Sequence, residues 1–298
     1  MIDVLISAVV PIALVALVGA AVGRGFALDI KTLSRVIIYA LLPALIFTGI
    51  SDTSLNLSSA AGIVASFWIT TALLYFLAWW LGRALKFSPE ARKSLIATTV
   101  YANVGNMGLP FVLFSLGEAG LERAIVYLVA SALTISALFS IALKGEGVIG
   151  GLRFALKLPA FWAALAALVL SQMAISLPLS LVRGIELLGS AAVPVALLTL
   201  GIQLSQTPFA FGRAELFGAS LRLLVSPLVA FGVGWLLQMR GLDLQVLVIQ
   251  AAMPVAVNSL IWVTELGGDR LRVAKTVVLS TLLSFVTLPV VLWLTGRT

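Results

Sequence analysis

Two residue types are missing from the 298-residue chain altogether, cysteine and histidine. Without cysteine, the chain can form no disulfide and no thiolate metal site. Without histidine, it lacks the usual proton carrier of physiological pH and the commonest metal ligand. A membrane-embedded enzyme would need a nucleophile–base pair or a set of metal ligands. Because the usual residues for both are absent, we expect no catalytic residue, no bound metal and no enzymatic activity.

Charged residues are also scarce. They make up 10% of the chain, against 61% hydrophobic residues, and the mean hydropathy is +1.15. Soluble domains average about 25% charged residues, so this composition predicts a multi-pass protein surrounded by membrane lipid. The net charge of +7 comes from single basic residues in short loops, so we expect no nucleic-acid partner. Nor does the chain contain a nucleotide-binding motif, which argues against ATP-driven transport.

Ten apolar segments each approach the ~20 residues that a helix needs to cross the hydrocarbon core. They lie at about residues 3–23, 33–50, 59–81, 93–117, 121–143, 158–176, 184–204, 214–237, 244–265 and 272–295. The longest connection, 144–157, is rich in glycine and separates residues 1–143 from residues 158–298. We therefore predict an all-α polytopic membrane protein with ten transmembrane helices in two five-helix repeats.

Basic residues are distributed unevenly between the two sides of this arrangement. The loops that follow segments 1, 3, 5, 7 and 9, with the adjoining helix ends, contain fifteen: Arg24, Lys31, Arg35, Arg83, Lys86, Arg92, Lys93, Lys144, Arg153, Lys157, Arg213, Arg222, Arg270, Arg272 and Lys275. On the bounds above, Arg222 falls a turn or two inside the eighth segment, and moving it does not change the bias. The opposite side has only Arg123, Arg183, Arg240 and Arg297. Cytoplasmic loops are enriched in Lys and Arg, so we predict a cytoplasmic 144–157 loop and both termini outside the cell membrane.

The two halves resemble each other at an offset of 151 residues, at which Pro43 corresponds to Pro194 and Asn103 to Pro254. Each half contains an odd number of segments, so the second half must be inverted relative to the first. We expect an inverted repeat, a common architecture of secondary transporters.

Two segments are interrupted at matching positions. The fourth contains Asn103-Val104-Gly105-Asn106-Met107-Gly108-Leu109-Pro110, and the ninth contains Met253-Pro254-Val255-Ala256-Val257-Asn258-Ser259. Glycine, asparagine and proline are poor helix formers, so the α-helical ladder should open near Asn106 and Pro254. Open backbone in hydrocarbon is tolerated only inside protein or beside a water-filled cavity. Paired interruptions in inverted halves are typical of a midplane binding site, whereas a lone proline would indicate a packing kink.

These interruptions supply the candidate site. A half-helix that starts after a break presents free N–H groups and a partial positive charge, which suits a carboxylate. Asparagine amides add donors, and glycines let a ligand approach the backbone. The candidate substrate-binding residues are Asn103, Gly105, Asn106, Gly108, Pro110, Met253, Pro254, Asn258 and Ser259. Glu265 and Gln250 are candidate coupling residues, although Glu265, like Glu186 and Glu215, is expected to be a solvated residue at a helix end.

The octapeptide 103–110 resembles the fourth-span motif of bacterial auxin efflux carrier (AEC) proteins, relatives of the plant PIN auxin carriers. The ten-span layout and the 253–258 segment match as well, so the resemblance covers nearly the whole chain. It implies the fold of bile-acid/sodium symporters, with spans 4 and 9 crossing near the midplane. It also implies a scaffold of spans 1, 2, 6 and 7 that forms a homodimer, and an elevator-like transport unit of spans 3–5 and 8–10. An organic anion would be held at the crossing by Asn106, Pro110, Pro254 and Asn258.

The leading hypothesis is a secondary or facilitative transporter of a small organic anion, either auxin-like or a dicarboxylate such as malate or malonate. The alternative is a sodium-coupled symporter of larger amphipathic anions, which would need a sodium cage of carboxylate, amide and carbonyl oxygens. A membrane-embedded enzyme and a channel are less favoured, because paired broken helices indicate alternating access. No cofactor is expected, and the sequence leaves the coupling ion open between none, a proton and sodium.

Overall fold

A computed structural model of the chain describes residues 8–51, 55–144, 153, 156–173, 175–207 and 212–296, with side chains except those of 136–144. The secondary structure of these residues is helical, as predicted. The α-helices are α2 (Val10–Gly25), α3 (Ile30–Val36), α4 (Leu42–Ser51), α5 (Leu57–Ala84), α6 (Pro89–Val100), α7 (Leu109–Lys144), α9 (Pro159–Gln172), α10 (Leu179–Gln206), α11 (Arg213–Ser220), α12 (Ser226–Leu236), α13 (Gly241–Ala251), α14 (Ser259–Leu266) and α15 (Arg270–Thr295). Three π-helical turns join or precede them: η2 (Ile37–Leu41), η3 (Val104–Gly108) and η4 (Leu221–Val225).

Five helical segments of the described chain are long and apolar enough to cross a membrane: 30–51, 57–84, 179–206, 213–236 and 270–295. Helices α2, α9 and α13 are apolar but shorter. The predicted fourth and ninth spans are each divided by a break, so their separate halves fall below the length of a continuous span. The chain is therefore a multi-pass membrane protein, and the full count of ten spans stays a prediction.

Short polar residues fix where three of the helices begin. The side chain of Asn56 accepts a hydrogen bond from Ser59 N (2.8 Å) at the start of α5. Ser88 caps α6 through Ala91 N (3.2 Å), and Asp269 caps α15 through Arg272 N (3.0 Å). Each cap satisfies a backbone donor that the first helical turn leaves free, so these helices start within a few residues of the predicted boundaries.

Gly117 divides α7 into two parts. Its φ of 71° is in the left-handed region, which glycine adopts without the steric penalty of a side chain. Residues 109–116 therefore form the second half of the interrupted fourth segment, and the chain then turns back into the fifth. The sequence placed the same boundary between residues 117 and 121.

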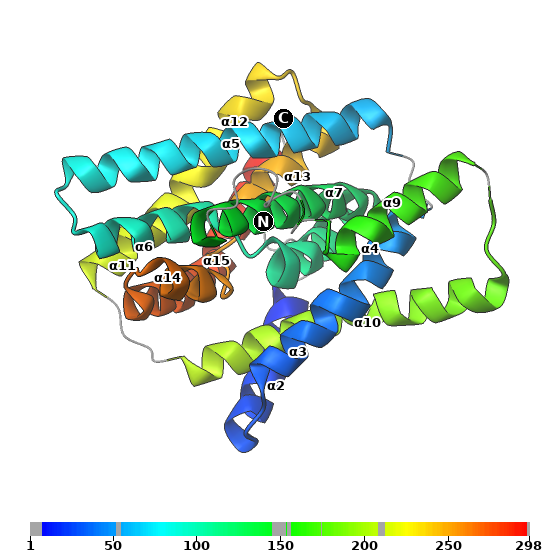
Figure 1. The fold of residues 1–298 in the computed structure, drawn as a ribbon, viewed down its shortest axis with the longest axis horizontal. Helices are drawn as coiled ribbons and strands as arrows, with labels where there is room; N and C mark the ends of the chain where they lie inside the picture. The colour runs from blue at the N-terminus through cyan, green and yellow to red at the C-terminus, as the bar shows by residue number, and fades with distance from the viewer. Residues whose placement is uncertain are drawn as a thin grey trace.

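The helices form two packed groups, which Figure 1 shows on opposite sides of α7. Helices α2, α4, α9 and α10 pack together, and α5, α6 and α11–α15 pack together. The contact between α2 and α10 is close because glycines face backbone: Gly19 faces Leu198, and Gly201 faces Ala16. Helix α7 contacts both groups, through α4 on one side and through α5 and α13 on the other.

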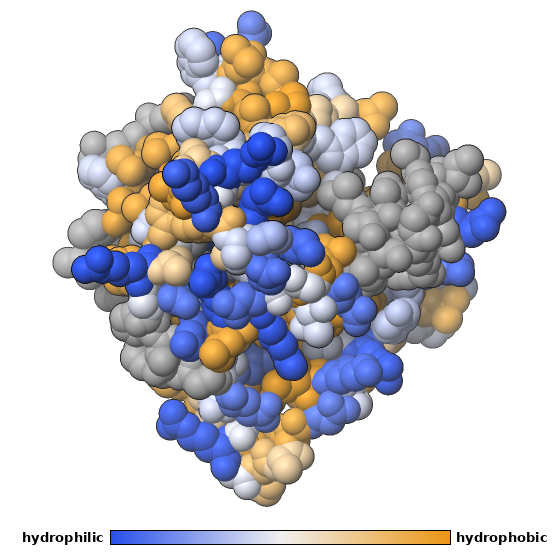
Figure 2. All heavy atoms as spheres, turned by 60° about the vertical axis from the view of Figure 1, so that its left-hand side comes forward, coloured by the Kyte–Doolittle hydropathy of each residue, from blue (hydrophilic) through white to orange (hydrophobic). Residues whose placement is uncertain are grey.

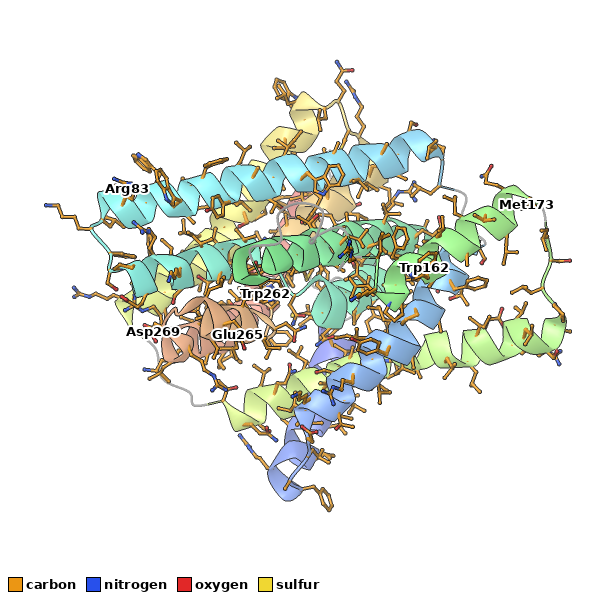
Figure 3. The ribbon with its side chains drawn as sticks, in the orientation of Figure 1. Arg83, Trp162, Met173, Trp262, Glu265 and Asp269 are labelled. Atoms are coloured by element: carbon orange, nitrogen blue, oxygen red, sulfur yellow. The ribbon has the colours of Figure 1, made fainter. Side chains whose placement is uncertain are left out.

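One end of the molecule gathers the polar ends of several helices. Arg83, Glu265 and Asp269 lie at the left of Figure 3, with Met173 at the opposite end. Figure 2 turns this left-hand side forward and shows hydrophilic residues gathered over it. The connection before α15 lies against the start of α6, because Asp269 N donates to the Ser94 hydroxyl at 2.8 Å. Two connections predicted to be cytoplasmic, 84–89 and 266–270, thus lie toward the same end of the molecule.

One residue of the charge bias does not lie in a loop. The sequence analysis counted Arg222 with the loop after the seventh segment, although it falls within the eighth segment (214–237), and the structure places it inside η4, only 2% exposed. The backbone carbonyls of two neighbouring helix ends provide its hydrogen-bond partners, which explains why it is stable there. Removing Arg222 from the loop residues leaves the direction of the charge bias unchanged.

Candidate functional site

The first interruption lies between α6 and η3, at residues 101–103. The sequence predicted the opening near Asn106, but Asn106 is inside the π-helical turn and the α-helical ladder opens earlier. In η3 the backbone bonds span five residues, from Gly108 N to Asn103 O (3.0 Å) and from Leu109 N to Val104 O. This wide turn leads into Pro110, which has no N–H to donate. The extended part of the break is therefore displaced toward α6.

The second interruption covers residues 252–258, between α13 and α14. Pro254 and Val255 are buried, whereas Asn258, the last residue before α14, is exposed. The buried Ser259 hydroxyl donates to Ala256 O at 2.6 Å and stabilises the turn that starts α14. The predicted opening at Pro254 is confirmed.

The two interruptions are bonded to each other. Asn103 N donates to Pro254 O, and Ala256 N donates to Tyr101 O, both at 2.8 Å. The two segments thus form a short antiparallel bridge. In addition, the Tyr101 ring stacks on Trp262 of α14, with centroids 5.4 Å apart. Each break thus provides hydrogen-bond partners for some of the backbone N–H and C=O groups of the other, because buried backbone groups need a partner. We call this pairing of residues 101–103 with 254–256 the crossing.

Arg222 lies where the two half-helices that lead into the crossing end. Its Nη1 donates to Thr99 O at 2.6 Å and more weakly to Val100 O at 3.4 Å, near the C-terminus of α6. Its Nη2 donates to Ala251 O, the last residue of α13. The last carbonyls of a helix have no partner within the helix and carry partial negative charge. One guanidinium therefore caps both half-helices. The signal that could have revealed it was one arginine within an otherwise apolar run, 221–225.

Four side chains around the crossing retain polar atoms that have no hydrogen-bond partner in the described part of the chain. These atoms are Thr99 Oγ1, Asn103 Nδ2, Arg222 Nε, and both amide atoms of Gln250. Asn103 is 5% exposed and Gln250 is 0% exposed, so bulk water does not reach them freely. Gln250 packs directly against Gly108, which leaves no room for a side chain at position 108. Buried groups of this kind are rare and costly unless a further polar partner occupies the site.

The remaining predicted residues have different environments. Pro110 is buried in the first turn of α7, and Met253 is 0% exposed within the main hydrophobic core. Gly105 lies beside Leu128. A Cβ added at position 105 would be 3.6 Å from Leu128 Cδ1, which is an ordinary contact distance. Asn106 is half-buried in η3. The crossing thus collects its polar groups from Asn103, Gln250 and Arg222, while Asn258 lies at its exposed edge.

The acidic residues are not gathered at the crossing. Glu265 is exposed on α14, near the end that carries Asp269 (Figure 3), as a solvated helix-end residue should be. Glu186 is exposed too. Glu215 differs from the expectation, because it is buried and accepts a hydrogen bond from Gly212 N (2.8 Å) at the start of its own helix. Within the described residues, no group of three or more acidic side chains could hold a metal ion.

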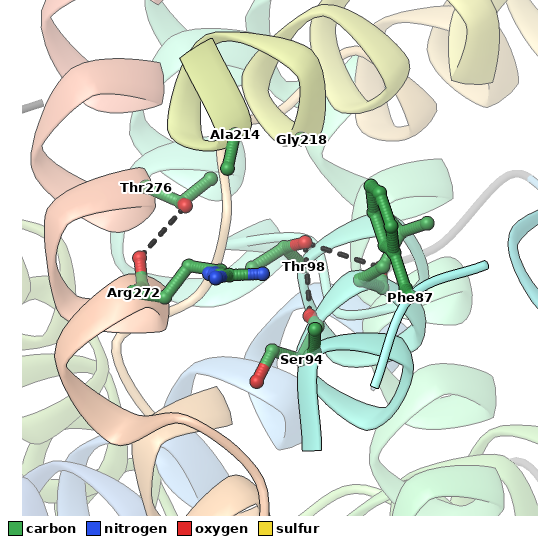
Figure 4. A pocket seen from close by; sticks show the side chains of 9 residues that line it. Phe87, Ser94, Thr98, Ala214, Gly218, Arg272 and Thr276 are labelled. Carbon is green, nitrogen blue, oxygen red and sulfur yellow. Dashed lines mark hydrogen bonds between the residues drawn. The ribbon is translucent and has the colours of Figure 1, made fainter. Parts of the chain in front are cut away.

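A recess lies on the α6, α11 and α15 side of the molecule (Figure 4). Its polar lining is already hydrogen-bonded: the Thr98 hydroxyl donates to Ser94 O (3.0 Å), and the Thr276 hydroxyl donates to Arg272 O (2.8 Å). Arg272 Nε also lies 3.5 Å from Asp269 Oδ2, within salt-bridge distance. The crossing has the stronger claim to a ligand because its donors have no partner.

A family model described as "Membrane transport protein" matches residues 4–148 and 151–292. The chain belongs to this family. It is the family that the motif at 103–110 indicated, so that resemblance is confirmed. An "Uncharacterized transporter" of Methanothermobacter thermautotrophicus is 32% identical over 273 residues, which cover 89% of this chain and 88% of the relative.

More distant relatives also align over most of their length. A protein of Rhizobium meliloti named "Putative malonate transporter" is 26% identical, over 88% of this chain and 86% of its own. The "Uncharacterized transporter YfdV" of Escherichia coli (strain K12) is 24% identical over 88% of both chains. A transporter family and transporter relatives confirm that the protein is a membrane transporter and agree with the expectation that it is not an enzyme.

Proposed function

We propose that this transporter carries a small organic anion, with a dicarboxylate of malonate size as the first substrate to test. The observation that carries the proposal is the crossing, where two broken helices meet around buried donors without partners. Among those groups the Asn103 N–H2 is a donor, and the Gln250 amide and the Thr99 hydroxyl can each donate or accept. The Arg222 guanidinium, whose Nη atoms are bonded to helix carbonyls, supplies positive charge. Hydrogen bonds from such groups to a carboxylate are charge-assisted and strong. The name of the Rhizobium meliloti relative supports malonate as the probe.

The proposed mechanism is alternating access by an elevator. The packing of α2, α4, α9 and α10 apart from α5, α6 and α11–α15 supports a scaffold of spans 1, 2, 6 and 7 and a moving unit of spans 3–5 and 8–10. The two halves, 1–143 and 158–298, would be inverted repeats joined by 144–157. Asn103 and Pro254, which correspond at an offset of 151, are direct hydrogen-bond partners, as expected near a pseudo-twofold axis. A homodimer through the scaffold and both termini outside the cell membrane belong to the same proposal.

The experiment measures binding of radiolabelled malonate to detergent-purified protein. Asn106→Ala and Asn258→Ala each remove an amide from the proposed site. A hydrogen bond to a charged group contributes about 1.5–3 kcal/mol, so each variant should bind roughly ten- to a hundredfold more weakly. Asn103→Ala should act in the same direction, because its Nδ2 has no other partner in the described chain.

The control is the remaining asparagine, Asn56, which is distant in sequence and caps α5. Alanine at this position would remove the cap, so Asn56→Ser is the better control because serine caps equally well. It should leave malonate affinity unchanged. If the asparagine variants at the crossing bind a transported anion as tightly as the wild-type protein does, the crossing is not the binding site. Uptake of other labelled carboxylates into proteoliposomes then identifies the substrate class.

A further inference from the structure

We infer that Arg222 is a built-in cation of the crossing, which cancels the negative ends of two half-helices and thereby sets the site to bind anions. The inference rests on the proposed function and assigns the sign of the site's charge to one residue. Arg222 is a positioning and specificity-determining residue in this account, because it acts through the helix ends that it caps.

The charge of Arg222 is buried and needs partners. Arg222 is almost fully buried, and a buried charge is stable only where it is paired and hydrogen-bonded. The salt bridges of the described residues are Arg123–Asp243 and Arg272–Asp269, so no carboxylate there is paired with Arg222. Its partners are instead the carbonyls of Thr99, Val100 and Ala251. The partial negative charges at the C-termini of α6 and α13 therefore balance the charge of Arg222.

The partial charges of four helix ends meet at the crossing. A helix carries about half a positive charge at its N-terminus and half a negative charge at its C-terminus. The C-termini of α6 and α13 together contribute about one negative charge, which the guanidinium cancels. The half-helices that follow the breaks, α14 and the one that η3 and α7 form, begin there with their positive ends. With Arg222 in place the crossing is net positive, whereas without it the four helix ends would cancel.

Arginine suits this position better than lysine does. A guanidinium has donors on two arms of a planar fork, so it can bond carbonyls from two separate helices at once. Nη1 serves α6 and Nη2 serves α13. A lysine ammonium is a point charge that would keep the charge but lose this bridging geometry. Charge and bridging can thus be separated by substitution.

The arrangement also bears on the coupling ion. In transporters with broken helices, the C-terminal ends of half-helices and unwound carbonyls are the groups that coordinate a coupling Na⁺. Here those carbonyls already accept hydrogen bonds from Arg222. The resident guanidinium thus takes the place of a coupling cation at these helix ends, and anion binding should need no sodium.

The test compares two probes that differ by one charge, malonate and monomethyl malonate, on the wild-type protein, Arg222→Lys and Arg222→Gln. A unit charge roughly 8–12 Å away, at an effective dielectric of about 20, changes affinity by about ten- to thirtyfold per unit of ligand charge. Arg222→Gln should therefore lose about ten- to thirtyfold more affinity for the dianion than for the monoanion. Arg222→Lys should lower both affinities by the same factor, because the charge is retained. Arg183→Gln, which removes an exposed arginine, is the matched control and should change neither.

A purely structural role for Arg222 predicts equal losses for both probes in Arg222→Gln, and that result would overturn the inference. A dianion-to-monoanion ratio that falls in Arg222→Lys would overturn it too, so the inference can be refuted even if the glutamine variant does not fold. The apparent melting temperature in the absence of ligand tests the capping separately. It should fall in both variants, and an unchanged value in Arg222→Gln would refute the capping. If the wild-type protein binds no carboxylate, the proposed function and the charge-setting role both fail, while the melting temperatures still decide whether Arg222 holds the two helix ends.

Discussion

Replacing Gly108 by alanine tests whether the first broken helix and α13 are packed as closely as the structure indicates. A Cβ built on Gly108 would collide with Gln250 Oε1 and would lie 3.1 Å from Gln250 Cδ and 3.2 Å from Nε2. Gln250 is 0% exposed, so its amide cannot swing into solvent to make room. Overpacking a buried site typically costs about 1–3 kcal/mol. Gly108→Ala should therefore destabilise the protein and displace an amide that belongs to the proposed site.

Gly105→Ala provides the matched control within the same π-helical turn. Its Cβ would lie 3.6 Å from Leu128 Cδ1, which is an ordinary contact. Both substitutions gain the higher helix propensity of alanine, about 0.8–1.0 kcal/mol, so this gain cancels when the two variants are compared. The expected difference between them is the overpacking cost alone, about 1–3 kcal/mol, with Gly108→Ala the less stable.

The assay is the unfolding free energy or apparent melting temperature of both variants in the same detergent, together with malonate binding. A second substitution sharpens it: Gln250→Ala removes the side chain that the new methyl group meets. The double variant should recover most of the stability lost by Gly108→Ala, because residues in contact show non-additive effects. Equal stability of the two glycine variants, or no recovery in the double variant, would show that Gly108 and Gln250 are not packed in this way.

Two further predictions concern coupling and topology. Glu265→Gln should leave malonate uptake unchanged, because Glu265 is exposed at a helix end; a variant that still binds malonate but no longer transports it would instead indicate a carboxylate-coupled cycle. Because the chain has no native cysteine, single cysteines at Ser88 and Gly147 should react with an impermeant reagent only from the cytoplasmic side, and one at Thr298 only from outside. Positions 147 and 298 lie outside the described residues, and labelling of position 147 in intact cells would contradict the inverted repeat.

The sequence predicted the existence of both breaks well, but not how their backbones are paired. Proline, glycine and asparagine mark a break because their local backbone chemistry disfavours a helix, whatever surrounds them. The bonds from Asn103 to Pro254 and from Ala256 to Tyr101 are contacts between residues about 150 positions apart, and no local pattern encodes them. The π-helical turn η3 also displaced the opening from Asn106 toward α6. Helix boundaries in the sequence follow composition, whereas the hydrogen-bond register depends on the neighbouring helix.

The sequence left Arg222 between a loop and the interior of the eighth segment for a related reason. A basic residue near the start of an apolar segment satisfies the charge bias of a cytoplasmic loop, and its partners, Thr99 and Ala251, offer only backbone carbonyls, which every residue has. A search for a buried counter-ion looks for Asp or Glu and finds none to suggest that this arginine is buried. What makes burial favourable is that two helices end side by side, which is a property of the crossing and of no single segment. When a lone arginine occurs in an apolar segment of a broken-helix transporter, helix C-termini should therefore be considered as its partners, as well as acidic residues.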